Sequence, residues 1–393
     1  MQQGANQSRF LLTTNDKTIK LWKVFEKRVR ALTNFNISDN DRIGSAAQAS
    51  PSGTPSLEHT AHTFMSPQSL RIPRVAAADA VLAARCRRVY PNTHTYHIHS
   101  LSVNSDCTTF ISADDLRVNL WSLDTGGTQS FTVVDMKPDN MEDLTEVITA
   151  AVFHPSNCAL FAFSSSRGVI RLADMRERAM CSSQARVFEE PEVPGSRSFF
   201  SEIIASISDV QFGAGGRYLL SRDYLTLKLW DVAMEQRPVA TFAVHDALRG
   251  KLCDVYENDA IFDKFECVMA ADGRHVATGS YGYLMRVFDT HTGADATVEV
   301  SKDPQRIRLA GSAQQPSSPR VGDDGDVLMT DAGLSGMLGA ASHSQPPPAG
   351  SGVIDPTSKL LHLAWHPRRS EVAAAASSSL YMMKARHEQR PET

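Results

Sequence analysis

The sequence predicts an all-β fold, a β-propeller made of repeated four-stranded units. Three observations support this prediction: one strand motif recurs along the chain, a second apolar strand precedes most of its copies, and turn residues separate the two. The motif has a polar turn, alternating apolar residues and a closing slot for a large side chain. Its copies read NDKTIKLWKV, ADDLRVNLWSLD, SSRGVIRLADMR, RDYLTLKLWDVA, SYGYLMRVFDTH and SSSLYMMKA. Such self-similarity is typical of a repeat architecture in which each unit is one blade.

The closing slot of the motif indicates how the blades hold together. It is occupied by Trp22, Trp121, Ala173, Trp230, Phe288 and Met383. Apolar and polar residues alternate ahead of the slot, as expected for a strand with two different faces. Burial of a Trp between neighbouring blades contributes up to about 3 kcal/mol. The copies predict about six blades of a WD-repeat propeller, whereas another antiparallel sandwich leaves the repetition unexplained.

Partner strands complete the predicted blades. Segments such as SISDVQFGAGGRYLLSRD and FECVMAADGRHVATGS lie directly upstream of a motif copy. Gly-Ala-Gly-Gly and Ala-Asp-Gly occupy the places where hairpin turns belong, because these residues adopt tight-turn conformations at little cost.

Composition and charge exclude several classes of function. Lys and Arg total 40 against 44 Asp and Glu, so there is no basic excess for binding nucleic acid. No stretch approaches the roughly 20 apolar residues that cross a bilayer, and the N-terminus has no apolar signal region. Six scattered cysteines without a C-x-x-C pair indicate free thiols in a reducing compartment. We therefore expect a protein of the cytoplasm and nucleus that binds neither nucleic acid nor membrane.

Insertions interrupt the repeat at four places. Residues 25–88 are rich in Ala, Ser and Pro, and residues 302–358 lack periodicity and are dominated by Gly, Pro, Ser and Ala. The second of these is expected to be a disordered loop. Two shorter insertions, at residues 135–147 and 189–206, mix acidic residues with apolar anchors and are expected to be ordered.

Several of these segments resemble one protein family. The segments are SADDLRVNLW, NMEDLTEVITAAVFHP, IRLADMRERAMC, RSFFSEIIASISDVQF, SRDYLTLKLWDV and KLCDVYENDAIFDKFEC. Together they resemble the WD-repeat B-type (55-kDa class) regulatory subunit of protein phosphatase 2A, from about Arg9 to His291 and again from Leu360 to Tyr381. The resemblance implies a seven-bladed propeller. About six blades are represented here, and the first, ahead of Arg9, is expected to be missing.

The resemblance also implies a function in which the chain itself is not an enzyme. The family is a regulatory subunit that forms a heterotrimer with the phosphatase scaffold subunit and catalytic subunit, and that recruits phosphoprotein substrates and binds inhibitors. A hairpin arm grips the scaffold in the family, and the insertion at residues 25–88 occupies its place. Neither a cofactor nor a metal is implied. The alternative is a WD-repeat scaffold or adaptor in another multiprotein complex.

The family binds substrates in a groove on one face of the propeller, and the resemblance assigns seven positions of this chain to that groove. They are Tyr96, Asp115, Glu142, Leu144, Val147, Phe200 and Phe262. The carboxylate of Asp115 is suited to accept hydrogen bonds from an Arg or Lys of a substrate. The alternative is that it caps its own turn, a role that the neighbouring Asp114 is able to fill.

The apolar candidates also have alternative interpretations. The spacing of Leu144 and Val147 predicts that both lie on one side of a short helical turn, and the alternative is that Leu144 anchors its loop in the core. One residue of the pair Phe199 and Phe200 is expected to anchor its loop, which leaves Phe200 as the candidate exposed contact. Phe262 is either exposed or part of the core.

Acidic residues cluster in the same insertions. They are Asp135, Asp139, Glu142, Asp143, Glu189, Glu190, Glu192, Asp254, Glu257 and Asp259. A rim of one charge steers basic partners toward a surface. The alternative is a solvated acidic surface without a partner.

Catalytic and metal-binding interpretations have little support. His94, His97 and His99 alternate only in part, and no carboxylate follows them at the spacing of zinc ligands. The sequence contains no G-x-S-x-G, P-loop or H-E-x-x-H motif.

Overall fold

The computed structural model describes residues 9–33, 74–123, 129–181, 185–191, 198–301, 307–308 and 357–384. Its strands form six antiparallel sheets, which confirms the predicted β-propeller and the six blades. Most of the predicted loop at residues 302–358 and residues 34–73 of the first insertion lie outside the described residues. No helix in the described ranges is both long and apolar enough to span a membrane.

The chain divides into two compact units. One unit comprises Met1–Thr13 and Lys20–Val89, and the other comprises Thr14–Ile19 and Tyr90–Thr393. The first sheet has the order β1-β2-β3, and its strands are β1 (Arg9–Asn15), β2 (Thr18–Thr33) and β3 (Arg74–Tyr90). Strands β2 and β3 have 16 and 17 residues, which corresponds to roughly 50 Å of extended chain each.

The other five blades belong to the second unit, and each is a meander in which consecutive strands pair. The second blade contains β4 (Ser100–Val103), β5 (Thr109–Ala113), β6 (Arg117–Ser122) and β7 (Ser130–Asp135). The third contains β8 (Ile148–Phe153), β9 (Leu160–Ser165), β10 (Ile170–Asp174) and β11 (Arg186–Phe188). The fourth contains β12 (Asp209–Phe212), β13 (Tyr218–Arg222), β14 (Thr226–Asp231) and β15 (Ala240–Ala243).

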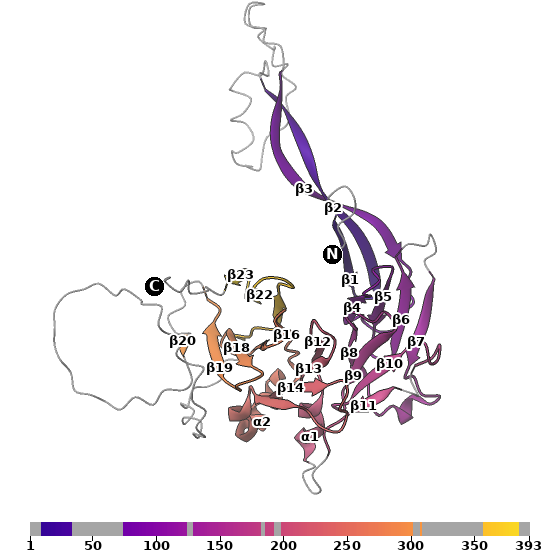
Figure 1. Cartoon of the computed structure of the whole chain (residues 1–393), viewed down its shortest axis with the longest axis vertical. Coiled ribbons are helices and arrows are strands. Elements are labelled where there is room, and N and C mark those ends of the chain that lie inside the picture. Colours follow the sequence, from indigo (N-terminus) through magenta and orange to yellow (C-terminus); the bar gives the residue numbers. More distant parts are fainter. Residues whose placement is uncertain are drawn as a thin grey trace, which may run out of the picture. The chain divides into compact units, whose positions relative to one another are not determined.

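The last two blades complete the described chain. The fifth contains β16 (Cys267–Met269), β17 (His275–Gly279), β18 (Leu284–Asp289), β19 (Asp295–Glu299) and β20 (Ile307–Arg308). The sixth contains β21 (His362–Trp365), β22 (Glu371–Ala376) and β23 (Ser379–Lys384). The first strands of successive blades contact one another, from β4 to β8, β12, β16 and β21. The blades of this unit therefore follow one another side by side (Figure 1).

The apolar core lies between the blades. One cluster joins Ile111 and Val118 of the second blade to Phe161 and Phe163 of the third. Equivalent clusters join the third blade to the fourth, the fourth to the fifth and the fifth to the sixth. Successive side chains of a strand point to opposite faces of its sheet. Each sheet therefore presents apolar side chains to the blade on either side.

The third blade carries Ala173 in the slot where other blades have a Trp. Ala173 is buried and pairs with Phe161 across the sheet. Three phenylalanines lie in the same cluster: Phe153 meets Phe161 edge to face, and Phe161 stacks with Phe163. Aromatic side chains on the adjoining strands thus fill the space that a Trp would occupy, which keeps the core closely packed.

A hydroxyl group satisfies the indole nitrogen of each Trp in the slot. In all three cases the acceptor is a Ser or Thr nine residues upstream, at 2.7–2.9 Å. Trp22 donates to Thr13, Trp121 to Ser112 and Trp230 to Ser221. The hairpin that precedes the slot places the two residues next to each other. A buried indole N–H without an acceptor would be costly, so the sequence spacing is a second mark of the repeat.

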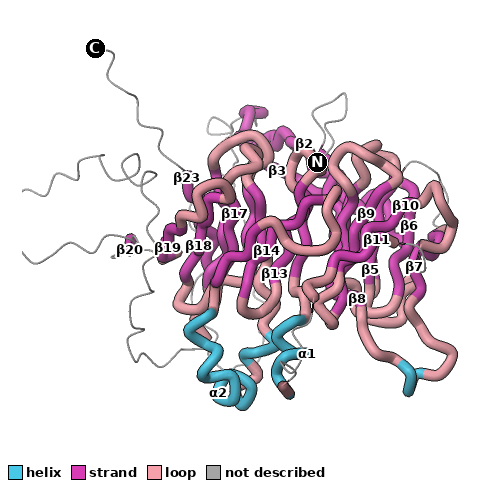
Figure 2. The backbone as a smooth tube through the Cα atoms, turned by 60° about the horizontal axis from the view of Figure 1, so that its bottom comes forward, coloured by secondary structure: helices cyan, strands magenta, loops and turns pink. Residues whose placement is uncertain are grey.

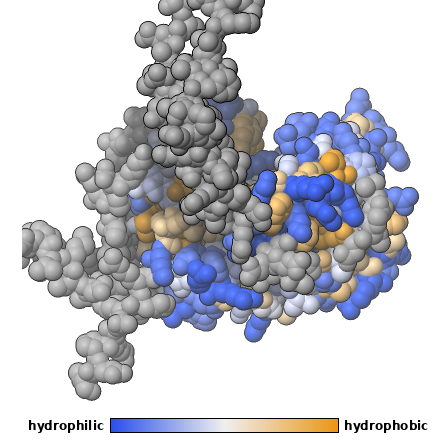
Figure 3. All heavy atoms as spheres, turned by 90° about the horizontal axis from the view of Figure 1, so that it is seen from above, coloured by the Kyte–Doolittle hydropathy of each residue, from blue (hydrophilic) through white to orange (hydrophobic). Residues whose placement is uncertain are grey.

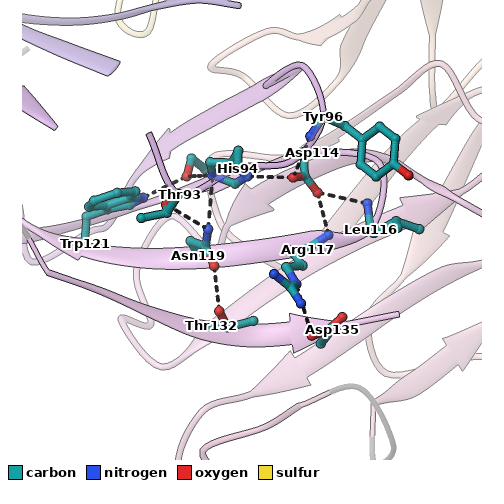
Figure 4. A network of polar contacts seen from close by, with 11 residues as sticks. Thr93, His94, Tyr96, Asp114, Leu116, Arg117, Asn119, Trp121, Thr132 and Asp135 are labelled. Atoms are coloured by element: carbon teal, nitrogen blue, oxygen red, sulfur yellow. Dashed lines mark hydrogen bonds and ion pairs between the residues drawn. The ribbon is translucent and has the colours of Figure 1, made fainter. Parts of the chain in front are cut away.

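In the second blade this bond extends into a longer chain of hydrogen bonds (Figure 4). The Ser112 hydroxyl lies 2.6 Å from Nε2 of His94, and Nδ1 of His94 lies 3.0 Å from the Asp114 carboxylate. The indole of Trp121 donates to the Ser112 hydroxyl, and Nδ1 of His94 donates to the ionised Asp114 carboxylate, which can only accept. The residue His94, which the sequence offered only as a doubtful metal ligand, therefore belongs to the core of the blade.

Asp114 also caps the turn between β5 and β6, as predicted. Its Oδ1 atom accepts hydrogen bonds from the backbone N–H groups of Leu116 at 2.9 Å and Arg117 at 2.7 Å. Burial alone would raise the pKa of this carboxyl, but the bonds from His94, Leu116 and Arg117 outweigh it and lower the pKa to about 2. The ionised form of Asp114 therefore stabilises the folded blade.

Figure 3 views the molecule from above the orientation of Figure 1, and hydrophilic and hydrophobic residues are interspersed over the described surface in that view. Scattered hydrophobic residues are normal on a protein surface and by themselves mark no binding site.

We predict that Asp114→Asn destabilises the chain by about 2 kcal/mol at neutral pH, because it removes the ionised acceptor. The depressed pKa gives stability that is fully present above about pH 4 and is lost as the pH falls toward 2. Urea denaturation as a function of pH measures this. Asp115→Asn is the matched control, with an expected change within about 0.5 kcal/mol. Equal losses for the two variants would contradict the role of Asp114.

Candidate functional site

The described helices lie in loops that connect one blade to the next. They are η3 (Met141–Asp143), α1 (Phe199–Ala205), η4 (Asp246–Lys251), α2 (Leu252–Glu257) and η5 (Ala260–Phe262). In a four-stranded meander the last strand ends at the same end where the next blade begins, so these loops share one end of the propeller. Figure 2 shows α1 and α2 together at that end. We call the described parts of residues 135–147, 189–206 and 245–264, with the turns that carry Tyr96 and Asp115, the insertion face.

Tyr96, Asp115 and Val147 lie around one turn of this face. The backbone N–H of Tyr96 lies 3.4 Å from the Asp114 carboxylate, and the backbone oxygen of Asp115 accepts a 2.7 Å bond from Ile148. No described residue bonds the half-buried side chain of Asp115. Since Asp114 caps the turn, the carboxylate of Asp115 is available to a partner.

The loop that contains Glu142 departs from the predicted geometry. Helix η3 ends at Asp143, and Leu144 already has extended backbone angles. The prediction that Leu144 and Val147 share one side of a helical turn is therefore wrong, because the helix ends before Leu144. Asn140 caps its start through the side chain, and only a single short turn follows. Glu142 is exposed, whereas Leu144 and Val147 are half-buried.

One ion pair holds this loop on the propeller, and a second lies between β6 and β7 where the loop begins. Arg171 of β10 contacts both carboxylate oxygens of Glu146, at 2.5 and 3.2 Å, and Arg117 of β6 contacts Asp135 at 3.0 Å. Burial alone would raise the pKa of Glu146, but the hydrogen bonds and charge of Arg171 lower it overall. Bidentate pairing of this kind fixes geometry as well as charge. Glu146 thus anchors the loop, whereas Asp135 pairs with its cross-strand neighbour Arg117 inside the blade.

Helix α1 shows that the two neighbouring phenylalanines have the opposite roles to those predicted. Ser198 and Ser201 form a capping box at its start, which sets the direction of the helix. Phe200 then packs on a buried cluster around Tyr224 and Leu225, while Phe199 is 68% exposed. The predicted exposed contact, Phe200, is therefore the anchor, and Phe199 is the more accessible ring. Sequence alone did not reveal which of the two faces the blade.

Helix α2 adds a tyrosine that sequence reasoning missed. Tyr256 is 39% exposed and Phe262 is 55% exposed, so Phe262 is not a core residue. Ring centroids are 5.2 Å apart for Phe199 and Phe200, 5.6 Å for Phe199 and Tyr256, and 5.9 Å for Tyr256 and Phe262. We call these four residues the aromatic patch. Their tilted and edge-to-face arrangement is a favourable one for aromatic rings.

The acidic residues of the insertion face fall into two groups. Asp135, Glu146, Glu190, Asp246 and Asp263 pair with Arg117, Arg171, Lys228, Arg249 and Lys359. A second group is exposed and makes no ion pair with any described residue, namely Asp139, Glu142, Asp143, Glu189, Glu202, Asp254, Glu257 and Asp259. Glu192 lies outside the described residues. Exposed Lys137, Lys251 and Lys264 do not offset the second group, so the face has a net negative charge.

The loops are adjacent through backbone contacts. The N–H of Ser166 bonds to the carbonyl of Val147, and the N–H of Ile207 bonds to the carbonyl of Ser165. The N–H of Tyr224 bonds to the carbonyl of Ile204 in α1. These bonds lead from the turn of Asp115 through the η3 loop to the aromatic patch. The structure therefore brings all seven predicted residues to one end of the propeller, with Phe200 packed on the buried cluster and in ring contact with Phe199 and Tyr256.

Comparison with known proteins agrees with this architecture. The family model described as "WD domain, G-beta repeat" matches residues 84–122. The B beta isoform of the serine/threonine protein phosphatase 2A 55 kDa regulatory subunit from Arabidopsis thaliana is 50% identical over 98% of this chain and 76% of its own length. The B-type regulatory subunit of protein phosphatase PP2A from Schizosaccharomyces pombe is 45% identical over 96% of this chain and 77% of its own length.

The identity and its extent decide the family. The chain belongs to the family of B-type, 55 kDa regulatory subunits of protein phosphatase 2A. These relatives are named as regulatory subunits, so the chain has a regulatory role and is not the catalytic subunit of the phosphatase.

The aromatic patch of this family member provides a test of the two phenylalanine roles. We predict that Phe200→Ala lowers the free energy of unfolding by about 2 kcal/mol, because it leaves a cavity against the buried cluster. Phe199→Ala is the matched control and should change it by less than about 0.5 kcal/mol, since its ring is exposed. Chemical denaturation of the full chain measures both. A larger loss for Phe199→Ala than for Phe200→Ala would reverse the assignment.

Proposed function

We propose that this chain is the substrate-targeting subunit of a protein phosphatase 2A holoenzyme. It binds the scaffold and catalytic subunits and recruits phosphoprotein substrates through the insertion face. The observation that supports this most directly is the combination of the aromatic patch with unpaired carboxylates on the same end of the propeller.

The chemistry of the face favours a particular kind of partner. Exposed Phe199, Tyr256 and Phe262 offer apolar area that is only partly buried in the chain itself. Unpaired carboxylates on the same loops attract Lys and Arg and speed encounter with basic segments. A partner segment that alternates apolar and basic side chains satisfies both features at once. Aromatic rings at the centre of such a contact would contribute most of the affinity.

The long strands β2 and β3 support the proposed contact with the scaffold. They are the longest strands of the described chain, and they occupy the start and end of the insertion at residues 25–88. Basic side chains predominate on their described parts, with Lys20, Lys23, Lys27, Arg85 and Arg87 against Glu26. A ribbon of this length and charge is suited to grip an acidic surface of a second subunit.

A reconstituted holoenzyme tests the proposal. The probe is a synthetic phosphopeptide in which a Ser-Pro phosphosite follows a segment of alternating Leu and Lys residues. The reference peptide carries Gly and Ser in place of that segment. We expect the holoenzyme to have a lower KM for the probe than for the reference at a similar kcat. Failure of the chain to assemble with the scaffold and catalytic subunits would overturn the proposal and favour an adaptor in another complex.

We predict that Asp115→Lys raises the KM for the probe at least about tenfold, because it replaces an available carboxylate with a like charge. Leu144→Ala should act in the same direction with a smaller effect. Glu177→Lys is the matched control, since Glu177 is exposed in the loop after β10, at the other end of the strands. Assembly with the scaffold should be unchanged in all three. If Asp115→Lys binds the probe as well as the parent does, the insertion face is not the substrate site.

A further inference from the structure

The segment at Thr357–Leu361, where the described chain resumes, pairs with the turn between β17 and β18. The N–H of Gly282 bonds to the Ser358 carbonyl at 2.6 Å, and the N–H of Leu360 bonds to the Ser280 carbonyl at 3.0 Å. Tyr281 and Lys359 form a β-bridge between these two bonds. The segment thus extends the edge of the turn between β17 and β18.

The path of this segment allows little variation. Leu360 is completely buried, and its carbonyl oxygen lies 1.8 Å from the position that a Cβ atom on Gly279 would occupy. Any side chain at Gly279 would displace the segment. Leu361 continues onto the same buried cluster that supports Phe200. The backbone around Lys359 is therefore fixed on both sides.

Lys359 reaches the loop that carries Phe262. Its ammonium group lies 2.5 Å from Oδ1 of Asp263, which directly follows Phe262 and ends helix η5. The side chain of Asp263 is only 11% exposed. Pairing with Lys359 compensates the burial of this carboxylate, which forms no other ion pair with the residues that the structure describes.

Tyr281 completes the attachment of the same loop. Its hydroxyl lies 2.8 Å from the Ala260 carbonyl and 3.0 Å from Oδ2 of Asp263, so its single hydrogen serves the start and the end of η5. The hydroxyl of Tyr224 lies 3.0 Å away on the other side. Because Ala260 and Ile261 are buried on this support, Phe262 is held outward.

We propose that Lys359 is a positioning residue for substrate binding: through Asp263 and Tyr281 it fixes helix η5 and the adjoining α2, and with them the exposed rings of the aromatic patch. This inference rests on the proposed function of the insertion face. It assigns a role in partner recognition to a residue that is 96 positions away in sequence from its ion-pair partner and does not itself belong to the patch. Lys359 lies outside the copies of the repeat motif and outside the insertions defined from the sequence.

The test uses the reconstituted holoenzyme with Lys359→Met and Lys359→Arg. Lys384→Met is the matched control, because Lys384 is exposed and pairs only loosely with Glu371, at 3.7 Å. The first readout is amide hydrogen exchange over residues 252–263. We expect it to be at least about tenfold faster in Lys359→Met, unchanged in Lys384→Met and restored in Lys359→Arg, because loss of the anchor allows local opening.

The second readout is the KM for the Leu-Lys phosphopeptide. We expect Lys359→Met to raise it about fivefold at constant kcat, and to add little in a chain that already carries Phe262→Ala, because neighbouring residues that act as one unit are not additive. A merely structural role would instead lower assembly with the scaffold or speed exchange throughout the chain, and either result would overturn the inference.

The outcomes separate the inference from the function on which it rests. If Phe262→Ala raises the KM but Lys359→Met does not, the positioning role is refuted while the proposed function stands. If Phe262→Ala leaves the KM unchanged, the aromatic patch is not the substrate site and the proposed function fails. In that case exchange over residues 252–263 still decides whether Lys359 fixes the loop.

Discussion

Every blade of the second unit depends on its neighbours to bury its two faces. The described apolar clusters lie between adjacent sheets, and each draws residues from both of them. A single repeat unit cannot bury its apolar face alone, and stacking against its neighbours completes the core. Packing therefore determines the strands and leaves the connecting loops free to vary in length and composition. The insertion face is a product of that freedom, because its loops extend beyond the strand ends.

Polar groups inside this packing are matched with unusual regularity. Each Trp of the closing slot donates to a hydroxyl, and in the second blade the bonds continue through His94 to Asp114. The third blade lacks both the Trp and the need for a hydroxyl partner, since phenylalanines fill the space beside Ala173. Both solutions fill the space between blades, and where a Trp is present its indole N–H has an acceptor.

Charge on the insertion face has two separate uses. Carboxylates with a nearby Arg or Lys from a blade tie the loops down, as Glu146 does with Arg171 and Asp263 with Lys359. Carboxylates on exposed turns have no such partner among the described residues and give the face its negative charge. The anchored group holds the loops in place, and the free group is available to a partner. The sequence alone does not show which carboxylates of an acidic insertion are paired and which are free.

Local patterns in the sequence determined much of this protein. Alternation, turn residues and the recurring slot predicted the blades, because strand faces and hairpins depend on residues only a few positions apart. The capping role of Asp114 was also predicted correctly, since a turn needs only one cap, and the role of Asp115 in substrate binding stays a prediction. Tertiary structure alone decided that Phe199 and not Phe200 is exposed, that the rings of Phe199, Tyr256 and Phe262 form one patch, and that Lys359 pairs with Asp263. The contacts of Phe199 with Tyr256 and of Lys359 with Asp263 join residues far apart in the chain, and nothing in the local pattern specifies which distant side chain completes them.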